Sequence, residues 1–151
     1  MSKPEKRKVK KMATVVLIVI AVVGIGLLGG FLADAPSRQE AGKLSFSDVK
    51  FKNLIDGTYI GEFKGEKSHL RDASVEVMIS GGEVADITIL KGAVDKEGKP
   101  TELRAGRDID DLFNDAIQSQ TLQVDVISGA TLTSKTHLKA LENALEQAQA
   151  K

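Results

Sequence analysis

The most extended hydrophobic pattern in the chain is the run from Ala13 to Ala33, which contains 21 residues and no charge. As a helix rising ~1.5 Å per residue, a run of this length crosses the ~30 Å hydrocarbon core of a bilayer. Residues 1–12 are basic, and Asp34 is the first acid on the other side. We therefore expect one transmembrane helix over 13–33, with the amino terminus in the cytoplasm and the remaining chain outside it.

A cleaved signal peptide is the alternative interpretation of this run. Ala33-Asp34-Ala35 has the small-x-small pattern that a signal peptidase reads. However, Pro36 would directly follow the cut and is expected to block it, and the run exceeds the ~7–15 apolar residues of a signal core. The sequence therefore favours a retained single-pass anchor.

Alternating apolar and polar positions predict the strands of a domain over 55–151. The segment 34–54 before it is polar and mixed, and we expect it to be a flexible linker between the membrane and the domain. Alternating stretches begin near Asp56, where Tyr59, Gly61 and Phe63 share one face, and recur over 73–80, 83–91 and 122–127. Gly81-Gly82 separates the second stretch from the third. This arrangement predicts a β-hairpin.

Spacings of three and four predict two helices. The first, over 107–120, places on one face Ile109, Leu112, Phe113, Ala116 and Ile117. The second, from residue 133 onward, places on one face Leu138, Leu141, Leu145 and Ala148, with Thr133 or Ser134 at the N-cap position. Residues 93–106 lack periodicity and predict a surface loop. The fold class is α+β, a small antiparallel sheet with two packed helices, preceded by one N-terminal transmembrane helix.

Composition and charge narrow the possible functions. A chain of 151 residues with 42% hydrophobic content forms one modest domain. The first 33 residues carry six basic side chains and one acid, so the remainder has 15 Lys and Arg against 20 Asp and Glu. An acidic body argues against a nucleic-acid partner. The chain has no cysteine, which excludes disulfides, thiolate catalysis and iron–sulfur ligation.

Few side chains are candidates for catalysis or metal binding. His69 and His137 are far apart in the sequence and lack a neighbouring acid cluster, so we expect both on the surface, with no metal site. Ser128 lacks the Gly-x-Ser-x-Gly context of a hydrolase nucleophile, and the sequence has no Gly-Lys-Ser/Thr phosphate loop. We therefore expect no catalytic residue of the chain's own and no stand-alone enzyme.

The stretch "DVISGATLTS" at 125–134 is the exception, because it lies at the expected positive end of the last helix. Free backbone N–H groups at a helix start favour a phosphate. Ser128, Gly129 and Ala130 are small enough for a ligand or a protein to approach the backbone, and Thr131 presents a hydroxyl beside them. From the residues alone, structural capping and a covalently bound group both remain open.

This stretch resembles the flavinylation motif of the FMN-binding domain family, found in Rnf- and Nqr-type membrane electron-transport complexes and in small extracytoplasmic proteins. The resemblance covers about residues 56–148. It implies that Thr131 carries FMN through a phosphoester, which would make the chain a phosphoprotein, and that Asp125 is the acid required by a flavin transferase. It also implies that Ser128, Gly129 and Ala130 form the core that this transferase reads, with Thr133 and Ser134 following it.

The function implied is that of a membrane-anchored, extracytoplasmic flavoprotein that relays electrons. Its expected partners are the flavin transferase, a membrane electron donor such as a quinone- or NADH-linked complex, and an external acceptor. Covalent attachment has a physical reason, since a dissociating FMN outside the cell is lost by dilution. The alternatives are a flavin-based redox sensor and a non-redox binding or tethering module.

Overall fold

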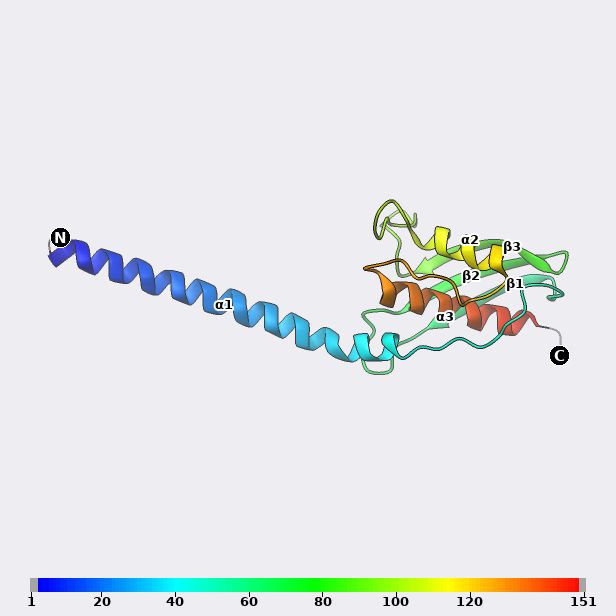
Figure 1. Cartoon of the computed structure of the whole chain (residues 1–151), viewed down its shortest axis with the longest axis horizontal. Coiled ribbons are helices and arrows are strands. Elements are labelled where there is room, and N and C mark those ends of the chain that lie inside the picture. Colours follow the sequence, from blue (N-terminus) through cyan, green and yellow to red (C-terminus); the bar gives the residue numbers. More distant parts are fainter. Residues whose placement is uncertain (1–2, 150–151) are drawn as a thin grey trace. The chain divides into compact units, whose positions relative to one another are not determined.

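The computed structural model describes residues 3–149, and their contacts divide the chain into two units. The first unit ends at Ala35 and consists of the greater part of helix α1 (Lys3–Gly42), and the second is a folded domain that begins at Pro36 (Figure 1). Pro36 lies inside α1. Proline lacks the N–H that bonds to the preceding turn, so the boundary falls where the helix is locally weakened.

The apolar part of α1 is exposed. Residues 12–42 have a mean hydropathy of up to 2.9 over a membrane-length window, and the described protein buries none of that window. Val15, Ile25 and Leu27 are each more than half exposed. Exposing such a surface to water is costly, whereas the hydrocarbon core of a bilayer solvates it and a helix satisfies its own backbone there. The predicted span at 13–33 therefore lies in a helix able to cross a membrane.

The segment 34–54 differs from the flexible linker expected from its composition. α1 continues to Gly42, and Val49, Phe51 and Leu54 are buried in the hydrophobic core of the domain. The linker prediction was wrong because the burial of isolated apolar residues in a polar stretch depends on distant parts of the chain that pack on them. The local sequence does not identify those parts. The domain thus includes chain well before residue 55.

The sheet contains β1 (Gly57–Phe63), β2 (Ala73–Ser80) and β3 (Glu83–Lys91), antiparallel and in that order. On the central strand, Val75 and Val77 are fully buried, while Met78 is exposed on the opposite face. This period of two confirms the alternation read from the sequence. The α+β fold class is confirmed for the described residues.

The predicted hairpin joins β2 to β3. Gly81 and Gly82 have φ values of +63° and +77°, as both central residues of a type I′ turn require. The carboxylate of Asp56, just before β1, accepts hydrogen bonds from their N–H groups at 3.1 and 2.8 Å. The turn is therefore stabilised by the backbone conformation of its two glycines and by the carboxylate that precedes β1.

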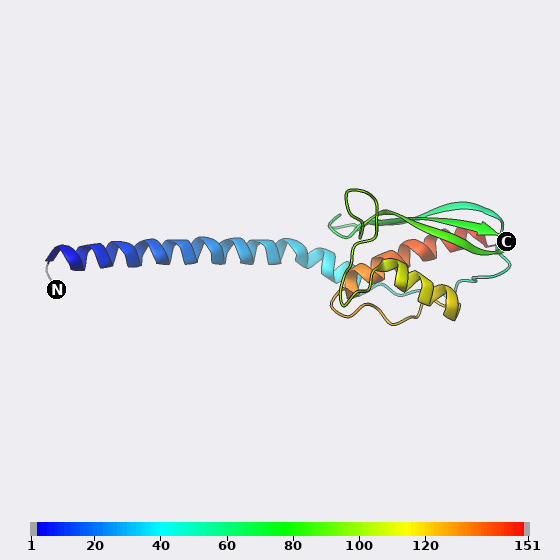
Figure 2. The same ribbon diagram turned by 90° about the horizontal axis from the view of Figure 1, so that it is seen from above.

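Helices α2 (Ile109–Ser119) and α3 (Thr131–Ala148) lie on one face of the sheet (Figures 1 and 2). The predicted faces of both helices are buried, except that Ile117 is half-buried. α3 crosses β1 at Gly61, where a Cβ atom would stand 1.9 Å from the carbonyl oxygen of Ala140. Only a glycine allows the helix to pack directly on the strand backbone at this distance.

The predicted strand at 122–127 does not form. All of these residues are described, and they run without ladder hydrogen bonds from α2 back to α3. Leu122 is buried and Val124 and Val126 are half-buried, so the expected inward positions are confirmed. The pattern reports which side of the segment packs on the domain, but a strand also requires a neighbouring strand.

α3 also binds the strap, residues 42–47, which begins at the last residue of α1. Lys135 Nζ donates to the carbonyl oxygen of Gly42 at 2.9 Å, and the N–H of Ser47 donates to Glu142 Oε1 at 2.6 Å. Glu142 is fully buried, and Lys139 Nζ lies 2.6 Å from its other oxygen. A buried carboxylate is tolerated only when it is paired in this way, so the strap is fixed to α3.

Candidate functional site

The motif predicted from the sequence lies on the segment between α2 and α3 and on the first turn of α3, away from the sheet (Figure 2). Its members differ in burial. The exposed ones are Asp125, Ser128, Gly129 and Thr131, the half-buried ones are Ala130 and Thr133, and Ser134 is buried. The hydroxyl-bearing residue that the motif assigns to the cofactor is therefore open to another protein.

The start of α3 is not capped as expected. The helix begins at Thr131, and its N-cap is Ala130, with φ −125° and ψ +27°. Thr133 and Ser134 lie inside the helix, and no side chain among the described residues caps its first N–H groups. The capping prediction was wrong because the N-cap lies three to four residues earlier, at Ala130. Its positive end stays available to an anion beside Thr131.

The side chain of Ser134 fixes the backbone of the motif through two hydrogen bonds. Its hydroxyl accepts a hydrogen bond from the N–H of Ile127 at 3.2 Å and donates to the carbonyl oxygen of Ala130 at 3.0 Å. The backbone N–H of Ala130 in turn donates to the carbonyl oxygen of Ile127 at 2.9 Å. These bonds fold residues 127–130 into a fixed turn. The buried serine therefore holds the backbone that presents Thr131.

Gly129 lies against the side chain of Arg104, a contact that the sequence did not suggest. Its φ of +81° lies in the left-handed region, and a Cβ atom there would stand 2.9 Å from Cδ of Arg104 and closer still to Nη1. Arg104 has no side-chain hydrogen-bond or ion-pair partner among the described residues. An uncompensated guanidinium thus lies over the backbone two residues before Thr131.

Arg104 stands on a tight turn within the loop 93–106. Ala105 and Gly106 have φ values of +53° and +76°, and the N–H of Leu103 donates to the carbonyl oxygen of Arg107 at 2.9 Å. A turn closed in this way fixes the backbone on both sides. The side chain of Arg104 extends to Gly129, and the adjacent Leu103 lines the pocket described next. The loop showed no periodicity, so only its Ala-Gly turn residues could have indicated this rigidity.

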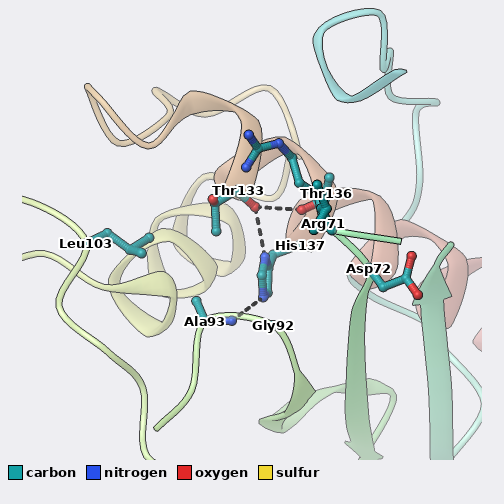
Figure 3. Close-up of a pocket in the computed structure, with 9 residues that line it drawn as sticks. Arg71, Asp72, Gly92, Ala93, Leu103, Thr133, Thr136 and His137 are labelled. Carbon is teal, nitrogen blue, oxygen red and sulfur yellow. Dashed lines mark hydrogen bonds between the residues drawn. The ribbon is translucent and has the colours of Figure 1, made fainter. Parts of the chain in front are cut away.

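The pocket, of about 250 Å³, lies beside the first turns of α3 (Figure 3). Thr133, Thr136 and His137 form its helical wall. The remaining lining comes from the chain before β2, the chain after β3 and the turn that carries Arg104, and consists of Leu70, Arg71, Asp72, Gly92, Ala93 and Leu103. Leu70 is 67% exposed and places an apolar side chain at the pocket opening. The pocket therefore has an apolar rim and a polar floor.

His137 forms part of the floor and is 1% exposed, so the surface position expected from the sequence was wrong. Its Nδ1 bonds to the carbonyl oxygen of Thr133 at 2.8 Å, and its Nε2 accepts from the N–H of Ala93 at 3.2 Å. Nε2 must be unprotonated to accept, so the ring is neutral with its proton on Nδ1. Burial lowers the pKa of His137, which keeps the ring neutral. Gly92 permits this contact, because a Cβ there would come too close to the ring.

The spacing of His137 was the signal that could have placed it. It follows Ser134 by three residues and precedes Leu141 by four, and both of these are fully buried. The buried face of α3 is thus wider than the leucine stripe.

Asp72 adds a buried negative charge at one end of the pocket. Burial raises its pKa, but bonds from Lys91 Nζ, the N–H of Gly65 and His69 Nδ1 outweigh this and lower the pKa to about 2. His69 itself is exposed, as expected. The carboxylate is therefore ionised at neutral pH and ties three segments of the chain together.

Comparison with known proteins agrees with this arrangement. No curated protein matches the chain. The FMN-binding domain family matches residues 71–146, a range that includes the pocket lining except Leu70, together with Arg104 and the motif around Thr131. This range is half of the chain, and it follows a helix that is long and apolar enough to anchor the protein in a membrane. The chain therefore belongs to the FMN-binding domain family.

Proposed function

We propose that the protein is an electron carrier whose FMN is attached to Thr131 through a phosphoester. The observation that carries the proposal is the position of Thr131, exposed at the uncapped start of α3 and inside the range that the family matches. A capping role does not explain this hydroxyl, since its side chain caps no helix.

The surroundings of Thr131 fit a phosphodiester anion. The first N–H groups of α3 have no side-chain cap, and the helix dipole favours negative charge beside them. Arg104 adds a cation held over Gly129 on a rigid turn. Guanidinium groups bind phosphate oxygens well because their N–H groups form a planar fork. We therefore assign Arg104 to the phosphate.

We assign the flavin ring to the pocket lined by the first turns of α3. Leu70 and Leu103 offer apolar surface to a flat ring, and Thr133 brings the pocket within two residues of Thr131 along α3. When bound, FMN supplies electron transfer. The pocket residues would hold the ring beside His137, which burial keeps neutral, and the proposed electron transfer would need no acid or base from the chain. On this basis the domain is a carrier, not an enzyme.

Attachment requires a transferase and an activated flavin, because a phosphomonoester does not condense with a hydroxyl unaided. A flavin dinucleotide such as FAD supplies the activation. Thr131 Oγ1 bonds to the phosphorus of the FMN half, the bond from that phosphorus to the AMP half breaks, and AMP leaves with the bridging oxygen. The hydroxyl proton passes to a base of the transferase. Asp125, exposed on the same segment, is the residue that we assign to recognition by this enzyme.

The location proposed is outside the cytoplasm, on a single-pass anchor. The basic residues before the apolar helix favour a cytoplasmic amino terminus. A protease added to right-side-out vesicles should then degrade the domain, and full protection in intact vesicles would contradict this orientation.

Intact mass of the full chain, co-expressed with a flavin transferase, tests the attachment site. The wild type should gain about 440 Da, the mass of FMN less water, and Thr131→Ser should gain it partially. Thr131→Ala should fold and gain nothing, whereas the control Thr133→Ala, one half-turn away, should be modified. An unshifted wild type in cells that flavinylate another substrate would contradict the proposal.

A second measurement separates carrier from sensor or tether. Membranes that contain the modified protein should bleach its flavin absorbance when NADH is added, and an external acceptor should restore it. A flavin that stays oxidised in respiring membranes would contradict the relay.

A further inference from the structure

The segment 122–127 has the side-chain pattern of a strand without a strand beside it. Its inward positions pack on the domain, while Gln123 and Asp125 are exposed. The segment runs along the outer side of the helices, away from the sheet (Figure 2). A strand-like segment without a neighbour exposes its backbone hydrogen-bonding groups.

Only some of the backbone donors of this segment are used. The N–H of Ile127 donates to Ser134 Oγ at 3.2 Å, and the N–H of Gln123 donates to Thr121 Oγ1 at 3.1 Å. The N–H groups of Val124 and Val126, which lie between these residues, have no partner among the described residues. Two backbone donors are therefore available for pairing with another chain.

An open groove lies along this segment. It has a volume of about 550 Å³ and is formed by the last turns of α2, from Asp115 to Ser119, and by the chain from Gln123 to Asp125. Polar side chains line most of it, so an added strand would meet no large apolar surface. The segment thus combines unpaired backbone groups with space beside them.

We propose that the flavin transferase binds this segment by β-augmentation, pairing a strand of its own with the backbone of Val124 and Val126. This inference rests on the proposed function. The enzyme must cover the turn at 127–130 to reach Thr131, so the segment leading into that turn lies under the same enzyme. Main-chain pairing supplies affinity, and exposed side chains such as Asp125 supply specificity. The proposal also explains why an alternating segment is left without a strand inside its own domain.

Proline substitution tests the backbone contact directly. Val126→Pro removes one N–H that has no partner in the free protein, so the fold should persist, whereas Val126→Ala removes the side chain and keeps the N–H. With the full chain in detergent, purified transferase and FAD, we expect the initial rate of mass gain to fall about tenfold or more for Val126→Pro, the effect of losing one hydrogen bond. For Val126→Ala the rate should fall about twofold or less. Val124→Pro should behave as Val126→Pro does.

Each outcome decides between distinct alternatives. Equal rates for the wild type and both proline variants, with folding verified by circular dichroism, would overturn the β-augmentation. Equal loss in Val126→Ala and Val126→Pro would assign recognition to the side chain and also overturn it. A dimer of the wild type that the proline variants abolish would identify a second copy as the occupant. A wild type that is never modified would instead refute attachment itself, and the inference with it.

Discussion

Replacing Gly61 by alanine tests the closest contact in the domain, between β1 and α3. A Cβ atom on Gly61 would stand 1.9 Å from the carbonyl oxygen of Ala140 and 2.6 Å from the backbone nitrogen of Ala144. Unstrained contacts between heavy atoms lie near ~3.5 Å. Both obstructing atoms belong to the helix backbone, so no side-chain rotation relieves them. α3 must move away from the strand by more than about 1 Å.

The cost follows from what α3 buries. Leu138, Leu141 and Leu145 are fully buried on this helix, so moving it loosens the core on which all three pack. Overpacked cores lose about 1–3 kcal/mol, and a backbone obstruction belongs at the upper end, near 3 kcal/mol. Domains of this kind have a free energy of unfolding of about 5–15 kcal/mol. Gly61→Ala should therefore remove a large fraction of the stability and still leave a folded protein.

Urea unfolding of the full chain in detergent measures this cost. Tyr59 is the one tyrosine in a chain without tryptophan, so its fluorescence reports on the domain alone. With m near 1–3 kcal/mol per molar urea, a loss of about 3 kcal/mol lowers the midpoint by about 1–3 M. The matched control is Gly42→Ala, where the nearest neighbour of an added Cβ would be Leu132 Cδ2 at 4.0 Å. The control should be neutral or slightly stabilised.

An unchanged midpoint for Gly61→Ala would refute the reasoning, because it would mean that α3 does not lie directly on β1. A large loss in Gly42→Ala would also count against it, since that result would show a general sensitivity to alanine.

Two further predictions concern charges near the pocket. Asp72, whose pKa is lowered from 3.8 to about 2, stabilises the fold above pH ~4, and this stability is lost as the pH falls through about 2. Asp72→Asn should therefore lower the free energy of unfolding by about 1–2 kcal/mol at pH 7, a value reduced because Lys91 is largely exposed to solvent. The variant should also lose less stability than the wild type between pH 4 and 2. Urea titrations that show the same loss of stability with falling pH in both proteins would disprove this role. Arg104→Gln should move the ³¹P resonance of the protein-bound flavin toward that of a free phosphodiester, whereas Arg104→Lys should move it less and Lys96→Gln not at all; an unmoved resonance in Arg104→Gln would remove the guanidinium from the phosphate.

Local patterns predicted the elements that depend on local interactions. The strands 73–80 and 83–91, the glycine turn between them and the buried face of α2 follow from side-chain periodicity and turn chemistry within a few residues. For this reason their positions match the structure closely. The motif around Thr131 was also found from consecutive residues.

Features that depend on distant segments were not predictable. His137 is buried because Ala93, 44 residues away, bonds to its ring. Arg104 reaches Gly129 because a turn far along the chain aims it there. The segment 122–127 alternates like a strand, yet pairing requires a neighbouring strand that residues 3–149 do not supply. In each case the missing information was the identity of the neighbour.

The strap changes how much of the chain between the apolar helix and β1 can act as a flexible linker. A flexible coil of the expected linker length, 21 residues, would let the domain wander over roughly 25 Å. Because Lys135 and Glu142 bind the strap to α3, most of that length belongs to the folded unit and contributes no slack. Val49, Phe51 and Leu54 in this stretch belong to the hydrophobic core, so shortening it would remove core side chains and destabilise the domain.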